Sequence, residues 1–380
     1  MTPPATPQAH RGPPFRADQV GSLLRPEFLH AAREQFKLGR ISAEQLRAAE
    51  DRAIAQAVKL QEDVGFTAIT DGEMRRAFFH IDFLEQLAGV KAGPASVIRL
   101  ADGTQQLTPP VIGVTGRVRH VADIQRADFE FLRSCLTPGH IGKVCIPSPT
   151  MLHFRGGRAG ISREAYPELD PAFYEDVAAA YARELQSLAA AGCRYVQLDD
   201  TNLAYLCDDK MRAAVRSRGD DPDELPHRYA DFINRLSAQR PAGMALTIHL
   251  CRGNFQSTWA ASGGYERVAE ALFAEMDVDG YFLEFDDARS GGFEPLRFLP
   301  RNKVAVLGLV TTKSGNDMES VDSLQRRIEQ ATQFASLEQL ALSPQCGFAS
   351  TMEGNKITEA QQRAKLELVV QTARKVWGSP

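Results

Sequence analysis

Four side chains of types that bind metal ions lie near the ends of apolar runs in the second half of the sequence. His249 and Cys251 are two residues apart, Glu284 ends another run, and Cys346 follows a third. Residues two apart on a strand face the same side, so the first pair can meet one ion. Two thiolates, an imidazole and a carboxylate suit zinc better than magnesium or calcium, which prefer oxygen ligands. Taken alone, a His-x-Cys pair in an apolar strand is more often part of a core.

A second group of polar residues follows apolar runs nearer the N-terminus. Ser22 follows the first run, Asp71 and Glu73 follow the second, and Asp199 and Asp200 end the fourth. Carboxylates at strand ends can bind an amine or act as acid/base groups. The alternative is that Asp71 or Asp199 caps a helix N-terminus. Glu73 fits this alternative less well, because the two arginines that follow it closely can hold its carboxylate ionised.

Apolar runs of strand length alternate with amphipathic stretches of helical length along most of the chain. Strands are predicted at Ala17–Gly21, Phe66–Thr70, Lys143–Pro147, Tyr195–Asp199, Ala245–Leu250, Gly280–Phe285, Val304–Val310 and Leu340–Ser343. Helices are predicted at Ala43–Val64, Pro171–Ala191, Pro222–Gln239, Tyr265–Met276, Met318–Phe334 and Thr358–Val376. The alternation predicts an α/β fold with a parallel sheet, and eight units predict a closed (β/α)8 TIM barrel. An open sheet with a miscounted strand is the alternative. In a barrel the C-terminal strand ends surround the active site, so the reactive residues should converge.

One segment, Ser96 to His120, breaks this alternation. Its apolar runs surround Asp102-Gly103 and Pro109-Pro110, which are typical of hairpin turns. We therefore expect an antiparallel hairpin insertion after the second strand, at about residues 96–120. The first fourteen residues contain five prolines, which indicates a disordered leader. Residues 15–380 should form a single catalytic barrel domain.

The composition argues against nucleic-acid and membrane partners. The chain has 380 residues, 43% hydrophobic and 24% charged, with a formal net charge of −4 and no clustered basic stripe. The N-terminal residues contain no secretory apolar run, and no stretch approaches the roughly 20 apolar residues of a membrane span. Six scattered cysteines without a C-x-x-C pair indicate reduced thiols and a cytoplasmic protein. The expected partner is a small molecule.

These motifs, in this order, resemble the cobalamin-independent methionine synthase family, in particular its C-terminal catalytic barrel. The pieces that carry the resemblance are Val20-Gly21-Ser22-Leu23, Asp71-Gly72-Glu73, Gln197-Leu198-Asp199, His249-Leu250-Cys251-Arg252-Gly253-Asn254-Phe255, Glu284 and Pro344-Gln345-Cys346-Gly347. The His-x-Cys, Glu and Cys set with its trailing Asn-Phe is specific, whereas the other pieces are weak singly. The similarity runs from about Phe15 to near the C-terminus, and the opening segment looks like the shorter, stand-alone branch of the family.

The resemblance implies a TIM barrel, zinc, and transfer of a methyl group to homocysteine to give methionine. The implied zinc ligands are His249, Cys251, Glu284 and Cys346. The implied homocysteine-binding residues are Ser22, Glu73 and Asp199, whose two carboxylates would pair with the substrate ammonium. Zinc coordination deprotonates a thiol that is otherwise mostly protonated at neutral pH. Three anionic ligands would leave excess negative charge at the site, which would keep a bound thiolate nucleophilic.

Two departures from the family concern the methyl donor. Full-length members carry an additional N-terminal barrel that helps bind folate, and none is expected in these 380 residues. Where the family has a histidine thought to protonate the leaving group, this sequence has Lys313. Lys313, with Asp199, is the candidate catalytic residue; it can act as an acid or bind an anion, and the alternative is a surface lysine. The donor is expected to be methyltetrahydrofolate or a methylated corrinoid, with a corrinoid protein as a possible partner.

Two other functions fit the same metal ligands. One is a thiol alkyltransferase with a different acceptor or electrophile, of the epoxide:coenzyme M transferase type. The acidic pair Glu73 and Asp199 favours an amino-acid thiol over coenzyme M, whose sulfonate would require cations. The other is a zinc-holding or regulatory protein without turnover. A different barrel enzyme, such as a decarboxylase relative, is the remaining alternative.

Overall fold

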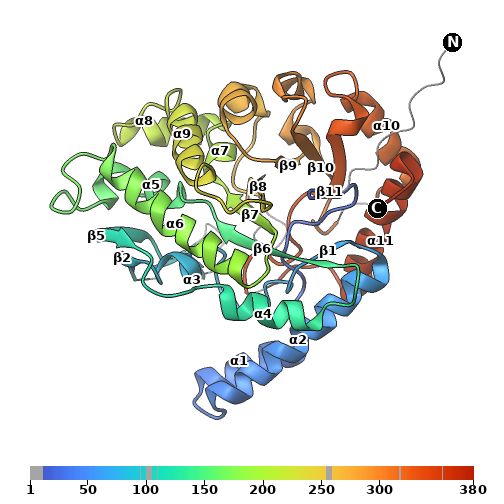
Figure 1. Cartoon of the computed structure of the whole chain (residues 1–380), viewed down its shortest axis with the longest axis horizontal. Coiled ribbons are helices and arrows are strands. Elements are labelled where there is room, and N and C mark those ends of the chain that lie inside the picture. The colour runs from blue at the N-terminus through green and yellow to red at the C-terminus, as the bar shows by residue number, and fades with distance from the viewer. Residues whose placement is uncertain are drawn as a thin grey trace.

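The central element is a curved sheet of seven parallel strands with helices around it (Figure 1). The computed structural model describes residues 12–380 except 95, 100–104, 109, 254–258, 316–317 and 353. The strands occur in the order β1 (Ala68–Ile69), β6 (Ile141–Pro147), β7 (Tyr195–Asp200), β8 (Ala245–Leu250), β9 (Gly280–Glu284), β10 (Val304–Val310) and β11 (Leu340–Pro344). Consecutive strands are neighbours and parallel, so the architecture is the predicted TIM-barrel-like α/β fold.

The strand register brings the predicted reactive residues to one end of the sheet. Asp199 of β7 pairs with His249 of β8, and Glu284 of β9 pairs with Gly308 of β10. The C-terminal ends of parallel strands lie at the same edge of a sheet. The predicted convergence of the strand ends is therefore confirmed.

The first predicted strand, Ala17–Gly21, does not form as a strand. The segment makes one parallel bridge, between Ala17 and Leu342 of β11, and the Thr70 hydroxyl donates to the Gly21 carbonyl on the other side. It thus lies between β11 and β1, where an eighth strand would close the barrel. Within this segment the Asp18 carboxylate accepts the Gln19 N–H at 2.8 Å, which removes one donor from a ladder, and just before it the same carboxylate accepts the Phe15 N–H at 3.1 Å.

The outer helices follow the predicted pattern, with local start and stop signals at their ends. Ser42 and Gln45 form a capping box at the start of α2, and Thr358 and Gln361 form another at α11. The helices are α1 (Glu27–Lys37), α2 (Ala43–Val64), α3 (Ile81–Leu84), α4 (Arg126–Cys135), α5 (Met151–Phe154), α6 (Ala172–Ala190), α7 (Asn202–Tyr205), α8 (Asp209–Ser217), α9 (Leu225–Ser237), α10 (Val321–Ala331) and α11 (Glu359–Trp377). The helix predicted at Tyr265–Met276 is instead a 3-10 turn, Tyr265–Val268, followed by a π-helical turn, Glu270–Glu275.

The antiparallel insertion is confirmed, and it begins earlier than predicted. β2 (Ala88–Ala92) pairs with β5 (Ile112–Arg119), and β3 (Ser96–Arg99) pairs with β4 (Gln105–Thr108). The outer pair therefore starts at residue 88. The predicted turn at residues 102–103 and residues 1–11 of the predicted leader lie outside the described residues.

Side chains fill the interior of the sheet near its N-terminal end. Lys143 is fully buried, with its ammonium 3.0 Å from an Asp18 carboxylate oxygen and 4.0 Å from the centre of the Phe282 ring. The Tyr195 hydroxyl donates to the same carboxylate at 2.8 Å. The barrel is consequently a packed core open to ligands at its C-terminal rim. Among the described helices, none is long and apolar enough to cross a membrane.

Candidate functional site

Three of the predicted metal ligands meet at the C-terminal rim of the sheet. The ligand atoms of His249, Cys251 and Cys346 all lie within 4.8 Å of one another, and the two sulfur atoms are 3.3 Å apart. His249 lies near the end of β8, Cys251 follows that strand, and Cys346 follows β11. No side chain of the three is more than 9% exposed. Two sulfurs and one nitrogen at this spacing form a potential metal site.

Two unsatisfied polar atoms support this interpretation. Among the described residues, neither His249 Nε2 nor Glu284 Oε2 has a hydrogen-bond partner, although both are buried. The other ring nitrogen of His249 lies 3.4 Å from Asp199 Oδ1. Buried polar atoms are rarely left unpaired, and a metal-binding histidine commonly has a carboxylate at its second nitrogen. The residues present therefore fit a bound metal ion.

The two thiols and the imidazole shift one another's pKa values. The hydrogen bond from Cys251 lowers the pKa of Cys346, whereas the same contact, followed by burial, raises the pKa of Cys251. Burial disfavours the charged imidazole of His249, but the contact with Asp199 and then the charge of Cys346 raise its pKa overall. The contacts therefore favour deprotonation of Cys346 over Cys251, and they favour the charged form of His249 more than in a free imidazole.

Glu284 lies beside this group, not within it. Its Oε1 accepts hydrogen bonds from the Arg252 backbone N–H at 3.2 Å and from Gln345 Nε2 at 3.3 Å. Its Oε2 lies 3.5 Å from Arg289 Nη2 and 3.7 Å from Arg252 Nη1. Of the four predicted ligands, the structure brings three together and holds the fourth among arginines.

The sequence analysis missed both arginines. Arg252 is completely buried, and its guanidinium donates to the Tyr265 hydroxyl and the Gly263 carbonyl, both at 2.7 Å. Arg289 stacks over the half-exposed Trp259 ring at 5.4 Å. The expectation of uncompensated negative charge is therefore corrected, because two cations flank Glu284. The sequence did offer one signal for Arg252, because this arginine directly follows the predicted ligand Cys251.

The second predicted group also forms, and it includes a residue not predicted. Oxygen atoms of Glu73 and Asp199 and the sulfur of Cys145 all lie within 4.8 Å of one another. Arg76 forms an ion pair with Glu73. Burial raises the pKa of Glu73, Arg76 opposes this rise, and Asp199 adds to it. Two acids so close together, with one arginine, favour a further cation between them.

Backbone geometry holds Glu73 in this position. Glu73 has a φ of 54°, the left-handed conformation that side chains rarely adopt, and its N–H donates to Asp71 at 2.8 Å. A Cβ atom at Gly21 would lie 2.3 Å from Glu73 Oε1 and 2.7 Å from Cys145 Sγ. Gly21 is thus required for the first segment to pass over this group. Strain at a buried acid is typical of a functional position.

The other acids predicted nearby have local backbone roles. Asp71 accepts the N–H of Glu73 in a turn, and Asp200 accepts the Leu203 N–H at 2.8 Å at the start of α7. The capping alternative, raised for Asp71 and Asp199, thus does not describe Asp71, which closes a turn with no helix after it, and the contact of Asp200 was not predicted. Asp199 makes no such contact, since its Oδ1 accepts from Gln197 Nε2 at 2.7 Å and faces His249.

Ser22 lies against the segment that carries Cys346. Its carbonyl accepts the Phe348 N–H at 2.8 Å, and a Cβ atom at Gly347 would lie 2.0 Å from its hydroxyl oxygen. The predicted residues Ser22, Asp199 and His249 therefore belong to one continuous site. The predicted Asn254-Phe255 pair lies outside the described residues.

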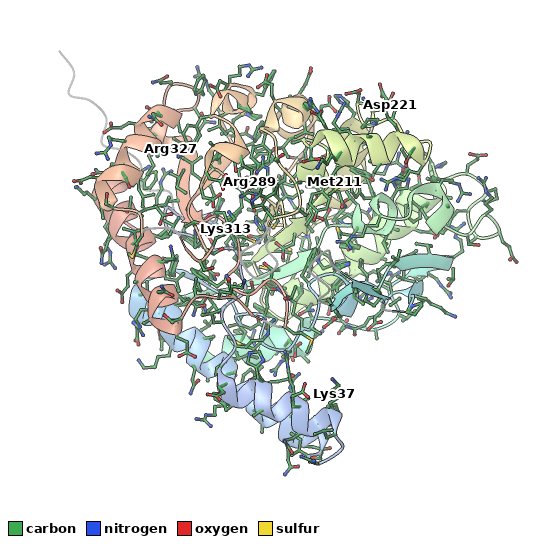
Figure 2. The ribbon with its side chains drawn as sticks, turned by 180° about the vertical axis from the view of Figure 1, so that it is seen from behind. Lys37, Met211, Asp221, Arg289, Lys313 and Arg327 are labelled. Atoms are coloured by element: carbon green, nitrogen blue, oxygen red, sulfur yellow. The ribbon has the colours of Figure 1, made fainter. Side chains whose placement is uncertain are left out.

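Lys313 follows β10 and is paired with an acid that follows β9. Its Nζ donates to Asp286 Oδ2 at 2.5 Å, and its side chain is only 7% exposed. The surface-lysine alternative is therefore wrong. Arg289 Nη2 lies 3.5 Å from the other oxygen of Asp286, so Lys313 and Arg289 share this acid. Figure 2 labels both of these basic residues.

Comparison with known proteins places this fold and site in a family. The family model described as cobalamin-independent synthase, catalytic domain, matches residues 15–375, so the chain belongs to that family. The uncharacterized protein YxjG of Bacillus subtilis is 47% identical over 96% of this chain and 95% of its own length.

Two solved structures share the architecture. A putative vitamin-B12-independent methionine synthase from Listeria monocytogenes has a TM-score of 0.76 and 37% identity, over 96% of this chain and 99% of that one. A B12-independent methionine synthase from Shewanella, in complex with selenomethionine, has a TM-score of 0.70 over 95% of this chain and 97% of that one. At 19% identity, the second likeness shows the fold alone.

Proposed function

We propose that the protein is a zinc-dependent S-methyltransferase that methylates the thiol of homocysteine to give methionine. The observation that carries this proposal is the group His249, Cys251 and Cys346, whose ligand atoms lie within 4.8 Å of one another, beside a carboxylate oxygen of Glu284 that has no hydrogen-bond partner among the described residues. Sulfur and nitrogen ligands select zinc over magnesium or calcium.

The three clustered residues would hold the ion, and Glu284 would supply the fourth ligand. When bound, zinc would supply a Lewis acid that keeps a substrate thiol deprotonated. Asp199 Oδ1 lies 3.4 Å from His249 Nδ1 and would help to orient the imidazole beside the two sulfurs. Arg252 and Arg289 offset the negative charge of the thiolates and of Glu284.

The acidic pair would bind the ammonium group of the amino-acid substrate. Glu73 and Asp199 converge, and within the described part of the chain Arg76 forms an ion pair with Glu73, whereas no arginine lies within ion-pair distance of Asp199. A buried ammonium between them would satisfy both charges through charge-assisted hydrogen bonds. Because Asp199 also contacts His249, the amine site adjoins the metal site, as one small aminothiol requires. Ser22, beside the Cys346 segment, would contact the remaining part of the amino acid.

Lys313 is proposed to serve the methyl donor, and Asp199 is proposed as the acidic catalytic residue. Lys313 forms an ion pair with Asp286, and its ammonium would bind an anionic group of the donor. The donor would be methyltetrahydrofolate or a methylated corrinoid, in which case a corrinoid protein would be a partner.

The test is a product assay on zinc-loaded protein. The protein is incubated with homocysteine and each candidate donor, and methionine is measured by mass spectrometry, with Cys346→Ser as the inactive control. A parallel series with coenzyme M and other thiols tests the alkyltransferase alternative. Transfer to coenzyme M but not to homocysteine would contradict the proposed acceptor, and no transfer to any thiol would favour the zinc-holding alternative.

A further inference from the structure

The Glu284 carboxylate is buried but loosely held. Its side chain is 0% exposed, yet its four polar contacts lie between 3.2 and 3.7 Å. Charge-assisted hydrogen bonds to a carboxylate are usually about 2.7–2.9 Å long. By comparison, Lys313 contacts Asp286 at 2.5 Å two residues further along the chain. Glu284 Oε1 therefore accepts two long hydrogen bonds, whereas Oε2 has two guanidinium groups nearby and no hydrogen bond among the described residues.

The two arginines beside Glu284 differ in how firmly they are held. The Arg252 guanidinium is fixed by the Tyr265 hydroxyl and by the Gly263 carbonyl, and its plane lies over the Tyr265 ring. Arg289 is anchored through its Nε by Asp287, whereas neither terminal nitrogen of Arg289 has a hydrogen-bond partner among the described residues. The Arg252 guanidinium is thus held in place by its partners, whereas the terminal nitrogens of Arg289 can move with the Glu284 carboxylate.

We propose that Arg252 and Arg289 form a guanidinium clamp that competes with the metal ion for Glu284 and so keeps one metal position accessible to a substrate thiol. This proposal rests on the proposed zinc site, and it assigns to Arg252 and Arg289 the control of how firmly Glu284 binds the metal. A carboxylate that leaves a metal inside a dry site needs a cation to receive it, because an unpaired buried charge is costly. The clamp provides two cations, because Arg289 Nη2 lies 3.5 Å and Arg252 Nη1 lies 3.7 Å from Glu284 Oε2, the oxygen without a hydrogen bond.

The clamp predicts that removing a cation makes zinc bind more tightly. In Arg289→Gln, Glu284 loses its mobile partner and should remain on the metal. The zinc dissociation constant, measured by competition with a chromophoric chelator, should fall by about tenfold, the size of one charge-assisted contact. The dissociation constant of homocysteine should rise by a similar factor, because the thiol must displace a more firmly bound carboxylate.

Matched variants separate charge from general damage. Arg289→Lys keeps the charge and should return the zinc dissociation constant to within about threefold of wild type. Arg289→Met is a second neutral variant and should reproduce Arg289→Gln. Arg297→Gln removes an exposed arginine that pairs with Glu266 and should change neither constant. Thermal unfolding of each variant identifies any that fails to fold.

Cobalt-substituted protein provides a readout independent of activity. Homocysteine should increase the thiolate-to-cobalt absorption of the wild type, and in Arg289→Gln a higher concentration should be needed for the same increase. Weaker metal binding in both neutral variants would overturn the clamp and leave a structural role for Arg289. Absence of zinc binding by the wild type would instead refute the proposed function itself.

Discussion

Asp199 Oδ1 lies 3.4 Å from His249 Nδ1, and this contact joins the acidic pair to the metal-binding group. Both residues end neighbouring strands and are partners in the register of β7 and β8. A single side chain therefore contributes to two functions, since it orients an imidazole and helps form the amine site.

Metal content depends on the two cysteines. Protein purified without chelators should contain about one zinc per chain, and Cys251→Ser and Cys346→Ser should each lose most of it, because structural thiolate ligands contribute much of the affinity. Elemental analysis gives the stoichiometry. Cys135→Ser, on α4, is the control and should retain the metal. Full zinc occupancy in the double variant of Cys251 and Cys346 would rule out the assigned site.

Homocysteine binding depends on Glu73. Glu73→Gln removes a carboxylate proposed to pair with the ammonium and should weaken binding by about 1.5–3 kcal/mol, with zinc content unchanged. Isothermal titration measures the affinity, and Glu367→Gln, on the surface of α11, serves as the control. Loss of zinc from Glu73→Gln would show that Glu73 supports the metal instead of the substrate.

Lys313 should affect the donor more than the chemical step. Lys313→Met is expected to raise the KM for an anionic donor and to leave the pH dependence of kcat nearly unaltered. It should also lower stability by about 3 kcal/mol, because Asp286 would be left buried without its closest partner. The double variant with Asp286→Asn should recover part of this stability. If Lys313→Met instead causes a large loss of kcat and removes the basic limb of the pH profile of kcat, Lys313 is the general acid.

Stability should fall in mild acid because of His80. Burial, followed by Arg155 and Arg76, lowers the pKa of His80 to about 3 in the folded protein. The unfolded chain takes up this proton near pH 6.5, so the stability present above that pH is lost as pH falls from 6.5 towards 3, at about 1.4 kcal/mol per pH unit. Urea unfolding of His80→Leu should show a correspondingly flatter dependence between pH 6 and 4.5. The surface variant His227→Gln is the control and should keep the pH dependence of the wild type. If the free energy of unfolding of His80→Leu changes with pH as steeply as that of the wild type, His80 is not the cause of the acid destabilisation.

The sequence by itself determined the order of strands and helices and the end of the sheet at which the reactive residues lie. Apolar runs and helix caps are local signals, and β8 forms at the predicted residues, Ala245–Leu250. Consecutive parallel strands share one C-terminal edge, so residues at strand ends, such as His249 and Cys346, converge whatever the details of packing.

The pairing of charges was decided only by the tertiary structure. No periodic pattern in the sequence predicts the ion pair between Arg289 and Glu284. The same is true of the contact between Lys313 and Asp286, which are 27 residues apart along the chain. The first segment was predicted as a strand from its short apolar run, but within it the Asp18 carboxylate accepts the Gln19 N–H that a strand would donate to its neighbour. Such contacts depend on distances of a few ångströms between side chains from different elements, and these distances are set by how the whole barrel packs.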